Sequence, residues 1–167
     1  MEDRPLGIKI LTVLYALGTG IALITLVASI PGLISGSEEI AKLGVSRIFV
    51  AFTLFSMLGL LLWATAGLMV GERWGWIGLA SQVIHALLTN ATYIYNMLQV
   101  HISGTEMRNI KTVARSGFEV LILIYILTAG VLNFFSLDAD ERWSAFGKAA
   151  GIAIGIYTLQ QLIFWIA

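Results

Sequence analysis

The fold is decided by residues 48–70, which read IFVAFTLFSMLGLLLWATAGLMV. No charged side chain interrupts this run. An apolar stretch of about 20 residues is the length that an α-helix needs to cross the hydrocarbon core of a bilayer. The stretch therefore predicts a transmembrane helix, and the rest of the chain has to be interpreted with lipid as a solvent.

The composition of the whole chain agrees with a membrane environment. Of the 167 residues, 58% are hydrophobic and only 12% are charged, whereas a soluble domain carries about 25% charged residues. The charged residues are clustered, which leaves long uncharged runs between them. Ten basic residues balance ten acidic ones, so there is no basic surplus for binding nucleic acid. Cysteine is absent, which excludes disulfides, thiolate metal sites and cysteine nucleophiles.

The pattern predicts an all-α fold: a polytopic transmembrane bundle of five helices, or of four if the last helix does not cross. The expected helices are residues 6–30, 48–70, 74–100, 117–137 and 144–167, within a single transmembrane domain of residues 1–167. Pro31-Gly32 is expected to stop the first helix. The start of the chain lacks the basic region of a signal peptide, so we expect the first helix to be retained.

Two connections are expected to carry short interfacial helices. Ser37 is a candidate N-cap for a helix that ends near Leu43. Residues 101–116 place basic and apolar side chains on different helical faces, as in a segment that lies among the headgroups. The tight connection 71–75 predicts that the second and third helices form an antiparallel hairpin. The aromatic residues expected at the membrane interface on that side are Trp74, Trp76 and Trp143.

The third helix carries a stripe of polar side chains at spacings of three and four residues, on one face about 100° wide. The members of this stripe are Gln82, His85, Thr89, Thr92, Asn96 and Gln99. Unsatisfied polar groups in hydrocarbon cost several kcal/mol each, so the stripe is expected to face the bundle interior, a partner chain or a water-filled cavity. Two interpretations are open: hydrogen bonding that fixes the register between helices, or a polar cavity or ion path lined by the stripe.

Three polar residues outside the third helix complete the candidate ligand site or path. Glu119 is expected to lie level with Asn96 and Gln99 of the neighbouring helix. There it is either a carboxylate of the cavity or a residue that a helix N-terminus stabilises and that snorkels to the headgroups. Asn133 and Gln160 are expected to extend the stripe into a polar seam along the height of the bundle.

His85 is the ionisable member of the stripe. Ionisable groups inside a span are candidates for function, and an imidazole exchanges its proton near neutral pH. A neutral histidine with two hydrogen-bond partners is also an ordinary interior group, so both interpretations stay open. His101 belongs to a loop at another depth, and we therefore expect no histidine pair and no metal site.

The last helix has a spacing motif of its own. Gly147, Gly151 and Gly155 form a double G-x-x-x-G, which lets another backbone approach closely in a membrane. The expected partner is the first helix, through Ala16 and Gly20, with a second subunit as the alternative.

Short motifs before two of the spans resemble a known group. Arg4-Pro5-Leu6-Gly7-Ile8 is similar to the opening of small prokaryotic, often archaeal, four-helix membrane proteins of uncharacterised function. Arg73-Trp74-Gly75-Trp76 resembles the Arg-Trp-Ala-Trp element of the same group. The resemblance covers residues 4–137 and leaves out the last helix. It implies a cytoplasmic N-terminus and a prokaryotic plasma membrane, and it supplies no activity. Basic residues divide evenly between the two sides, so their distribution favours neither orientation.

The sequence lacks the constellations that carry catalysis in membranes. It has no carboxylate pair within one span, no glycine-rich phosphate loop, no Ser-His-Asp spacing and no zinc signature. We therefore expect a non-enzymatic membrane protein: an accessory or structural subunit, or a binder of a lipid or small hydrophobic ligand. The alternative is a small transporter or channel with a polar path along the third helix. The expected partners are membrane lipids and a homo-oligomer or larger membrane complex, without a cofactor, metal or nucleic acid.

Overall fold

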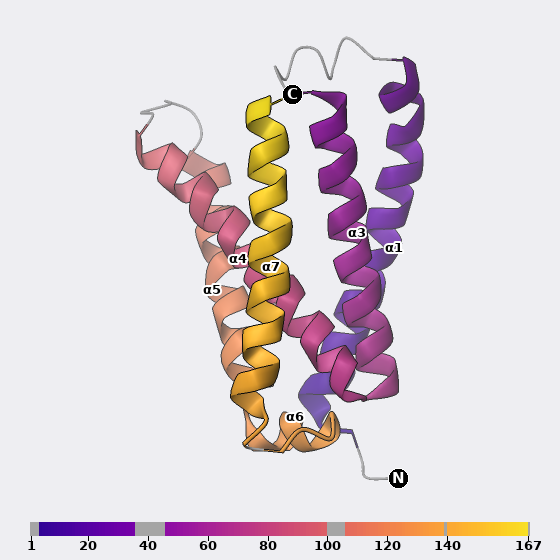
Figure 1. Ribbon diagram of the computed structural model, residues 1–167, viewed down its shortest axis with the longest axis vertical. Coiled ribbons are helices and arrows are strands. Elements are labelled where there is room, and N and C mark those ends of the chain that lie inside the picture. The colour runs from indigo at the N-terminus through magenta and orange to yellow at the C-terminus, as the bar shows by residue number, and fades with distance from the viewer. Residues whose placement is uncertain (1–3, 36–45, 100–105, 139, 167) are drawn as a thin grey trace.

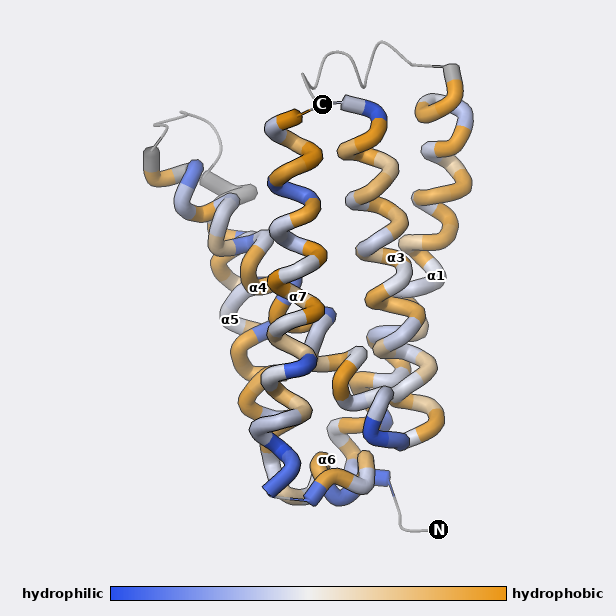
Figure 2. Tube along the Cα trace, viewed as in Figure 1, coloured by the Kyte–Doolittle hydropathy of each residue, from blue (hydrophilic) through white to orange (hydrophobic). Residues whose placement is uncertain are grey.

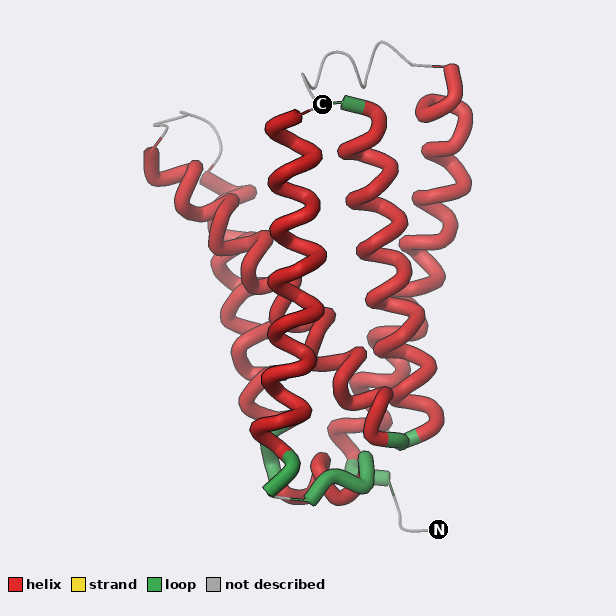
Figure 3. The backbone as a smooth tube through the Cα atoms, in the orientation of Figure 1, coloured by secondary structure: helices red, strands yellow, loops and turns green. Residues whose placement is uncertain are grey.

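The structure, a computed structural model, describes residues 4–35, 46–99, 106–138 and 140–166. Within these ranges the chain forms helices joined by short turns and contains no strand, which confirms the all-α prediction (Figure 3). The helices are α1 (Leu6–Ser35), α3 (Arg47–Val70), α4 (Arg73–Gln99), α5 (Glu106–Ile126), α6 (Ala129–Phe134) and α7 (Arg142–Ile166). Five of them are long, and the short α6 lies at the end of the bundle where α1 begins (Figure 1).

The first helix continues past its predicted end. α1 runs through Pro31 and ends at Ser35, so the prediction that Pro31-Gly32 stops it at residue 30 is wrong. Proline removes one backbone donor, and helices in membranes tolerate this loss because neighbouring groups satisfy the freed carbonyl. The interfacial helix predicted for residues 37–43 lies outside the described residues.

The α3–α4 hairpin follows the prediction, with ends within one residue of 48–70 and 74–100. Ser46 caps α3, and its hydroxyl accepts a hydrogen bond from the backbone N–H of Phe49 at 3.1 Å. Gly71 ends α3 with a φ of 79°. Glycine adopts this left-handed conformation without the strain that a Cβ would cause, which makes the tight turn into α4 favourable.

Glycines also let the two helices of the hairpin touch. A Cβ on Gly67 would lie 2.2 Å from the Cα of Gly75, and a Cβ on Gly75 would lie 2.3 Å from the Cα of Gly67. Atoms overlap at such distances, so any larger side chain would push the backbones apart. This contact sets the crossing of α3 and α4 and thereby fixes where the polar face of α4 points.

The largest difference from the prediction concerns α5. Residues 101–116 and 117–137 were expected to form an interfacial segment and a separate span, but one helix runs from Glu106 to Ile126. It ends because Thr128 adopts an extended conformation with a ψ of 147° and donates its hydroxyl to the carbonyl of Tyr125 at 2.8 Å. The predicted fourth span is thus divided into the lower part of α5 and the short α6.

An apolar core fills the end of the bundle near α6. Trp76 belongs to this core: it is 0% exposed, and its indole N–H donates to the carbonyl of Ile126 at 2.8 Å. Trp74 and Trp143 are exposed, and the position of all three tryptophans at a membrane interface stays a prediction. The other side chains that are almost completely buried here include Ile8, Leu68, Leu79, Val131, Phe135 and Leu137.

The outside of the bundle is apolar between polar ends. Among the described residues, three helices are long and apolar enough to cross a membrane: Leu6–Ile34, Arg47–Val70 and Arg142–Ile166. Hydrophilic residues gather near the ends of the helices and in the turns at the α6 end (Figure 2). Large apolar side chains such as Ile24, Leu62 and Leu162 face outward. Such a surface is compatible with a membrane protein, since apolar side chains are surrounded more favourably by lipid than by water.

Candidate functional site

Four residues of the polar stripe of α4 line a cavity of about 220 Å³: Gln82, His85, Thr89 and Thr92. The cavity lies between α3, α4 and α7, and Arg115 reaches it from α5. Its polar lining consists of Thr53, Gln82, His85, Thr89, Asn90, Thr92, Arg115, Tyr157, Gln160 and Gln161. Gln82, His85, Thr89, Thr92 and Gln160 are predicted site residues, so the structure brings these five together.

His85 begins a directed chain of hydrogen bonds across three helices. Its Nε2 lies 2.9 Å from Oε1 of Gln160 on α7. The Gln160 amide nitrogen donates to the hydroxyl of Ser56 on α3 at 3.0 Å, and that hydroxyl donates to the carbonyl of Thr53 at 3.1 Å. Because the Ser56 hydrogen is used, Ser56 accepts from Gln160, and the Gln160 oxygen accepts from His85. Nε2 of His85 therefore carries a proton.

This chain leaves Nδ1 of His85 for other partners. The hydrogen bond that the His85 side chain makes within the described residues uses Nε2. A neutral His85 thus presents Nδ1 as an acceptor, and a protonated His85 presents it as a donor. His85 is 8% exposed.

Two further hydrogen bonds tie neighbouring helices to α4. The hydroxyl of Tyr15 on α1 donates to Oε1 of Gln82 at 2.6 Å, which leaves the amide N–H groups of Gln82 as donors. Thr92 contacts the hydroxyl of Tyr157 on α7. Since Thr92 donates to the carbonyl of Leu88, the Tyr157 hydroxyl is the donor in that contact. Both interpretations of the stripe, helix registration and cavity lining, therefore describe parts of the same site.

Glu119 has other partners than the ones predicted. It is 8% exposed, and its carboxylate accepts from the amide of Asn90 at 2.8 Å and from Nε of Arg115 at 3.0 Å. The expected neighbours were Asn96 and Gln99. Because α5 begins at Glu106 and not at 117, Glu119 sits about three and a half turns along the helix, at about 3.6 residues per turn.

Two predicted members of the seam are not part of the site. Asn96 is exposed, because the last part of α4 leads away from α3 and α7 toward the start of α5 (Figure 1). Asn133 is exposed on α6, because the helix in which it was expected ends at Ile126. The side chain of Gln99 lies outside the described residues.

The glycines of α7 do not pack as predicted. A Cβ on Gly147, Gly151 or Gly155 would have no atom within 4 Å in the described part of the chain. The expected packing against Ala16 and Gly20 of α1 is therefore wrong. α7 packs mainly against α4, and its buried small residues are Ala145, Ala149 and Ala153. A second subunit at the glycines stays a prediction.

Several residues of the site carried a weak signal in the sequence. Asn90 lies off the polar stripe of α4, and Arg115 was assigned to an interfacial segment. Tyr15, Ser56 and Tyr157 are isolated polar groups in apolar helices, and such groups commonly hydrogen-bond to another helix. Their partners depend on helix rotation, which no single helix specifies.

Thr53 has a hydroxyl with an unusual environment. The oxygen is buried and has no hydrogen-bond partner among the described residues, although Thr53 lines the cavity. Buried hydroxyls in proteins nearly always have a partner. A polar group bound in the cavity would supply one.

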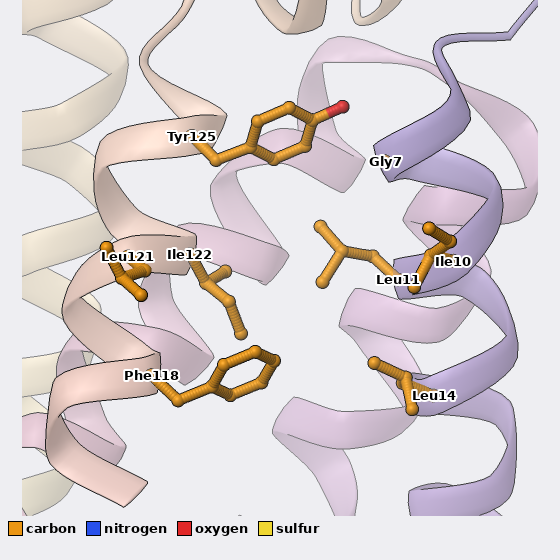
Figure 4. Close-up of a pocket in the computed structure, with 8 residues that line it drawn as sticks. All are labelled: Gly7, Ile10, Leu11, Leu14, Phe118, Leu121, Ile122 and Tyr125. Carbon is orange, nitrogen blue, oxygen red and sulfur yellow. The ribbon is translucent and has the colours of Figure 1, made fainter. Parts of the chain in front are cut away.

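A second cavity, also of about 220 Å³, lies between α1 and α5 (Figure 4). Its walls are Gly7, Ile10, Leu11, Leu14, Phe118, Leu121, Ile122 and Tyr125. The Tyr125 ring lies over Gly7, where a Cβ would come within 2.3 Å of the hydroxyl oxygen. This lining is almost entirely apolar, and the Tyr125 hydroxyl is its one polar side-chain group.

Comparison with protein-family models, curated proteins and solved structures finds no match for this chain. The resemblance to four-helix prokaryotic membrane proteins thus stays a prediction. Among the described residues there is no group of three or more His, Cys, Asp or Glu side chains that could hold a metal ion.

Proposed function

We propose that all five long helices cross the bilayer. α1 begins and α7 ends at opposite ends of the bundle, with α3, α4 and α5 alternating in direction between them (Figure 1), as an odd number of crossings requires. α4 is less apolar than a typical span, but it packs against α3, α5 and α7, which shelter much of its polar face. A helix of this length extends about 40 Å, at about 1.5 Å per residue.

Single cysteines test the crossing of α4. Glu72→Cys, in the α3–α4 turn, and Lys111→Cys, on the exposed side of α5, should react with a membrane-impermeant thiol reagent from opposite sides of sealed vesicles. Asp140→Cys, in the turn before α7, should react from the same side as Glu72→Cys. Labelling of Glu72→Cys and Lys111→Cys from the same side would contradict five crossings.

We further propose that the protein binds a small amphipathic molecule in the cavity beside His85. The observation that carries this proposal is the mixed character of the lining. Phe49, Met57 and Ala86 give it apolar walls, while the Gln82 amide and the buried Thr53 hydroxyl have hydrogen-bonding capacity to spare. Ligand sites typically combine apolar walls with a few fixed polar groups.

The size of the cavity limits the ligand. A volume of about 220 Å³ is smaller than the roughly 300–1,000 Å³ of pockets that enclose a drug-sized molecule. The cavity thus suits a compact molecule with one polar group and a short chain or single ring. A whole phospholipid is too large for it.

Filling the cavity tests the proposal. Thr89 lines the cavity, is exposed, and donates its hydroxyl to the carbonyl of His85 four residues earlier. Thr25 on α1 is also exposed and makes the same kind of bond to Ile21, but it does not line the cavity. Thr89→Trp places an indole in the cavity, and Thr25→Trp is the matched control.

Saturation-transfer NMR on the protein in nanodiscs, with benzoate, benzamide, octanoate and octanamide as probes, measures binding. We expect at least one probe to bind the native protein and the Thr25→Trp variant equally, and to bind Thr89→Trp at least about tenfold more weakly. If all four probes fail to bind, or bind Thr89→Trp as well as the native protein, the proposal is wrong.

The transport alternative requires a path through the bundle. Between Gln82 and the α6 end of the bundle, the interior is filled by apolar side chains that are 0% exposed: Leu68, Trp76, Leu79 and Phe135. This packing favours a binding site that is closed at one end, and it argues against a continuous pore. Flux of a probe in proteoliposomes that is lost in Thr89→Trp and retained in Thr25→Trp would favour transport instead.

A further inference from the structure

Arg115 brings a positive charge to the cavity. Its side chain is 59% exposed, whereas the side chain of its partner Glu119 is 10% exposed. A guanidinium is costly to expose to hydrocarbon, so its free part needs a polar surrounding. Arg115 lines the cavity, which provides that surrounding.

The ion pair with Glu119 uses only part of the guanidinium. The contact runs from Nε of Arg115 to Oε1 of Glu119 at 3.0 Å, while the other carboxylate oxygen accepts from the amide of Asn90 at 2.8 Å. The two terminal nitrogens of Arg115 take no part in this contact. They form the planar fork that binds a carboxylate or phosphate through two parallel hydrogen bonds.

Other cavity groups match the same type of ligand. The Gln82 amide is oriented by Tyr15 so that its N–H groups are free to donate. The Thr53 hydroxyl is buried without a partner among the described residues. Glu119, the acidic residue closest to Arg115 in the sequence, does not line the cavity, and both of its oxygens are occupied. The lining therefore contains one arginine and no acidic side chain among the described residues.

We propose that the cavity selects molecules with an anionic group, a carboxylate above all, which the terminal nitrogens of Arg115 bind. This inference rests on the proposed binding function and specifies its ligand class: a small organic anion with an apolar part. Arg115 keeps its contact with Glu119 through Nε while it binds the ligand. The apolar part of the ligand contacts Phe49, Met57 and Ala86, which line the same cavity.

Matched pairs of probes separate charge from shape. Benzoate and benzamide have nearly the same size and differ in charge, as do octanoate and octanamide. We expect the native protein to bind each carboxylate about ten- to a hundredfold more tightly than its amide, the range of a charge-assisted hydrogen bond. Binding is measured in nanodiscs by saturation-transfer NMR competition.

Three variants locate the preference. Arg115→Gln should bind carboxylate and amide with equal affinity, but it leaves the buried Glu119 without its cation and could misfold. The double variant Arg115→Gln with Glu119→Gln removes both charges of the pair, retains a partner for Asn90, and should show the same loss of preference. Lys111→Gln removes an exposed charge one turn away on α5 and should leave the preference unchanged.

The outcomes are distinct. Equal binding of carboxylates and amides by the native protein, blocked by Thr89→Trp, would overturn the anion proposal and leave the binding site intact. A carboxylate preference that persists in the double variant would overturn the role of Arg115. If no probe binds the native protein, the proposed function itself fails, and this inference fails with it.

Discussion

Replacing Gln160 with leucine should destabilise the protein, because this side chain joins α7 to both α3 and α4. Gln160 is 4% exposed, and it links His85 at 2.9 Å and Ser56 at 3.0 Å. Interhelical hydrogen bonds in membranes contribute about 0.6 kcal/mol on average and up to ~1.7 kcal/mol each. The loss of two bonds should lower the free energy of unfolding by about 1.2 kcal/mol, and by at most ~3.4 kcal/mol.

Gln161→Leu is the matched control. This substitution replaces the same side chain one residue further along α7, where Gln161 is half-buried at the cavity. The assay is reversible unfolding by SDS in lipid–detergent micelles, followed by tryptophan fluorescence and by helical circular dichroism. Gln161→Leu should change the free energy of unfolding by less than about 0.5 kcal/mol.

A double-mutant cycle isolates the His85–Gln160 bond. His85→Leu, Gln160→Leu and the double variant should show a coupling energy of about 0.6–1.7 kcal/mol, the range for one such bond. Additive effects, or a Gln160→Leu variant as stable as Gln161→Leu, would refute the reasoning, because the bond would then contribute nothing.

Two further predictions concern packing at the α3–α4 hairpin and the apolar core. Gly75→Ala should destabilise the protein by about 1–3 kcal/mol, since its Cβ would overlap Gly67. Gly147→Ala adds a Cβ that meets no atom of the described residues within 4 Å, so it should be neutral or stabilising by up to ~1 kcal/mol. Equal melting temperatures of the two variants would contradict the close crossing. Trp76→Phe should lose about 1–3 kcal/mol, because the carbonyl of Ile126 loses its donor in a buried site. Trp143→Phe, at an exposed indole, should stay within about 0.5 kcal/mol of the native protein, and equal losses would argue against the buried hydrogen bond.

Helix content followed directly from the sequence where one signal dominated. The run 48–70 predicted α3 because it combines spanning length with the absence of charge, and the connection 71–75 predicted the hairpin. The inward position of Gln82 and His85 followed from the cost of exposing polar groups to lipid. These inferences need one helix at a time, so a single sequence carries enough information for them.

Errors arose where the outcome depends on a second element. Residues 101–137 were divided at Gly117, but the amphipathic part continues into the span as α5, and the break falls at Thr128. Because the helix boundaries differ from the prediction, Glu119 contacts Asn90 and not the predicted Asn96. For the same reason, Asn133 lies outside the site. The partner of a residue depends on the offset and rotation of two helices, and the sequence of either helix is compatible with several such arrangements.

The glycines of α7 illustrate the same limit. Their spacing predicts a surface that another helix can approach, yet the face of α7 that is buried carries Ala145, Ala149 and Ala153. Alanine also permits close packing. The sequence therefore contains two small-residue faces on one helix. Which of them becomes buried depends on how α7 is rotated against its neighbours.

The most direct test of the central claim is the polarity that a probe meets on the stripe of α4. Because the chain has no cysteine, a spin label can be placed by Thr89→Cys in the cavity lining or by Ile24→Cys on α1, where the native side chain is 72% exposed. In nanodiscs, collision rates with a water-soluble nickel complex and with oxygen report polar and lipid surroundings. We predict that the nickel complex relaxes the label at position 89 more effectively than oxygen does, with the reverse at position 24. Oxygen-dominated relaxation at both positions would contradict an inward polar cavity.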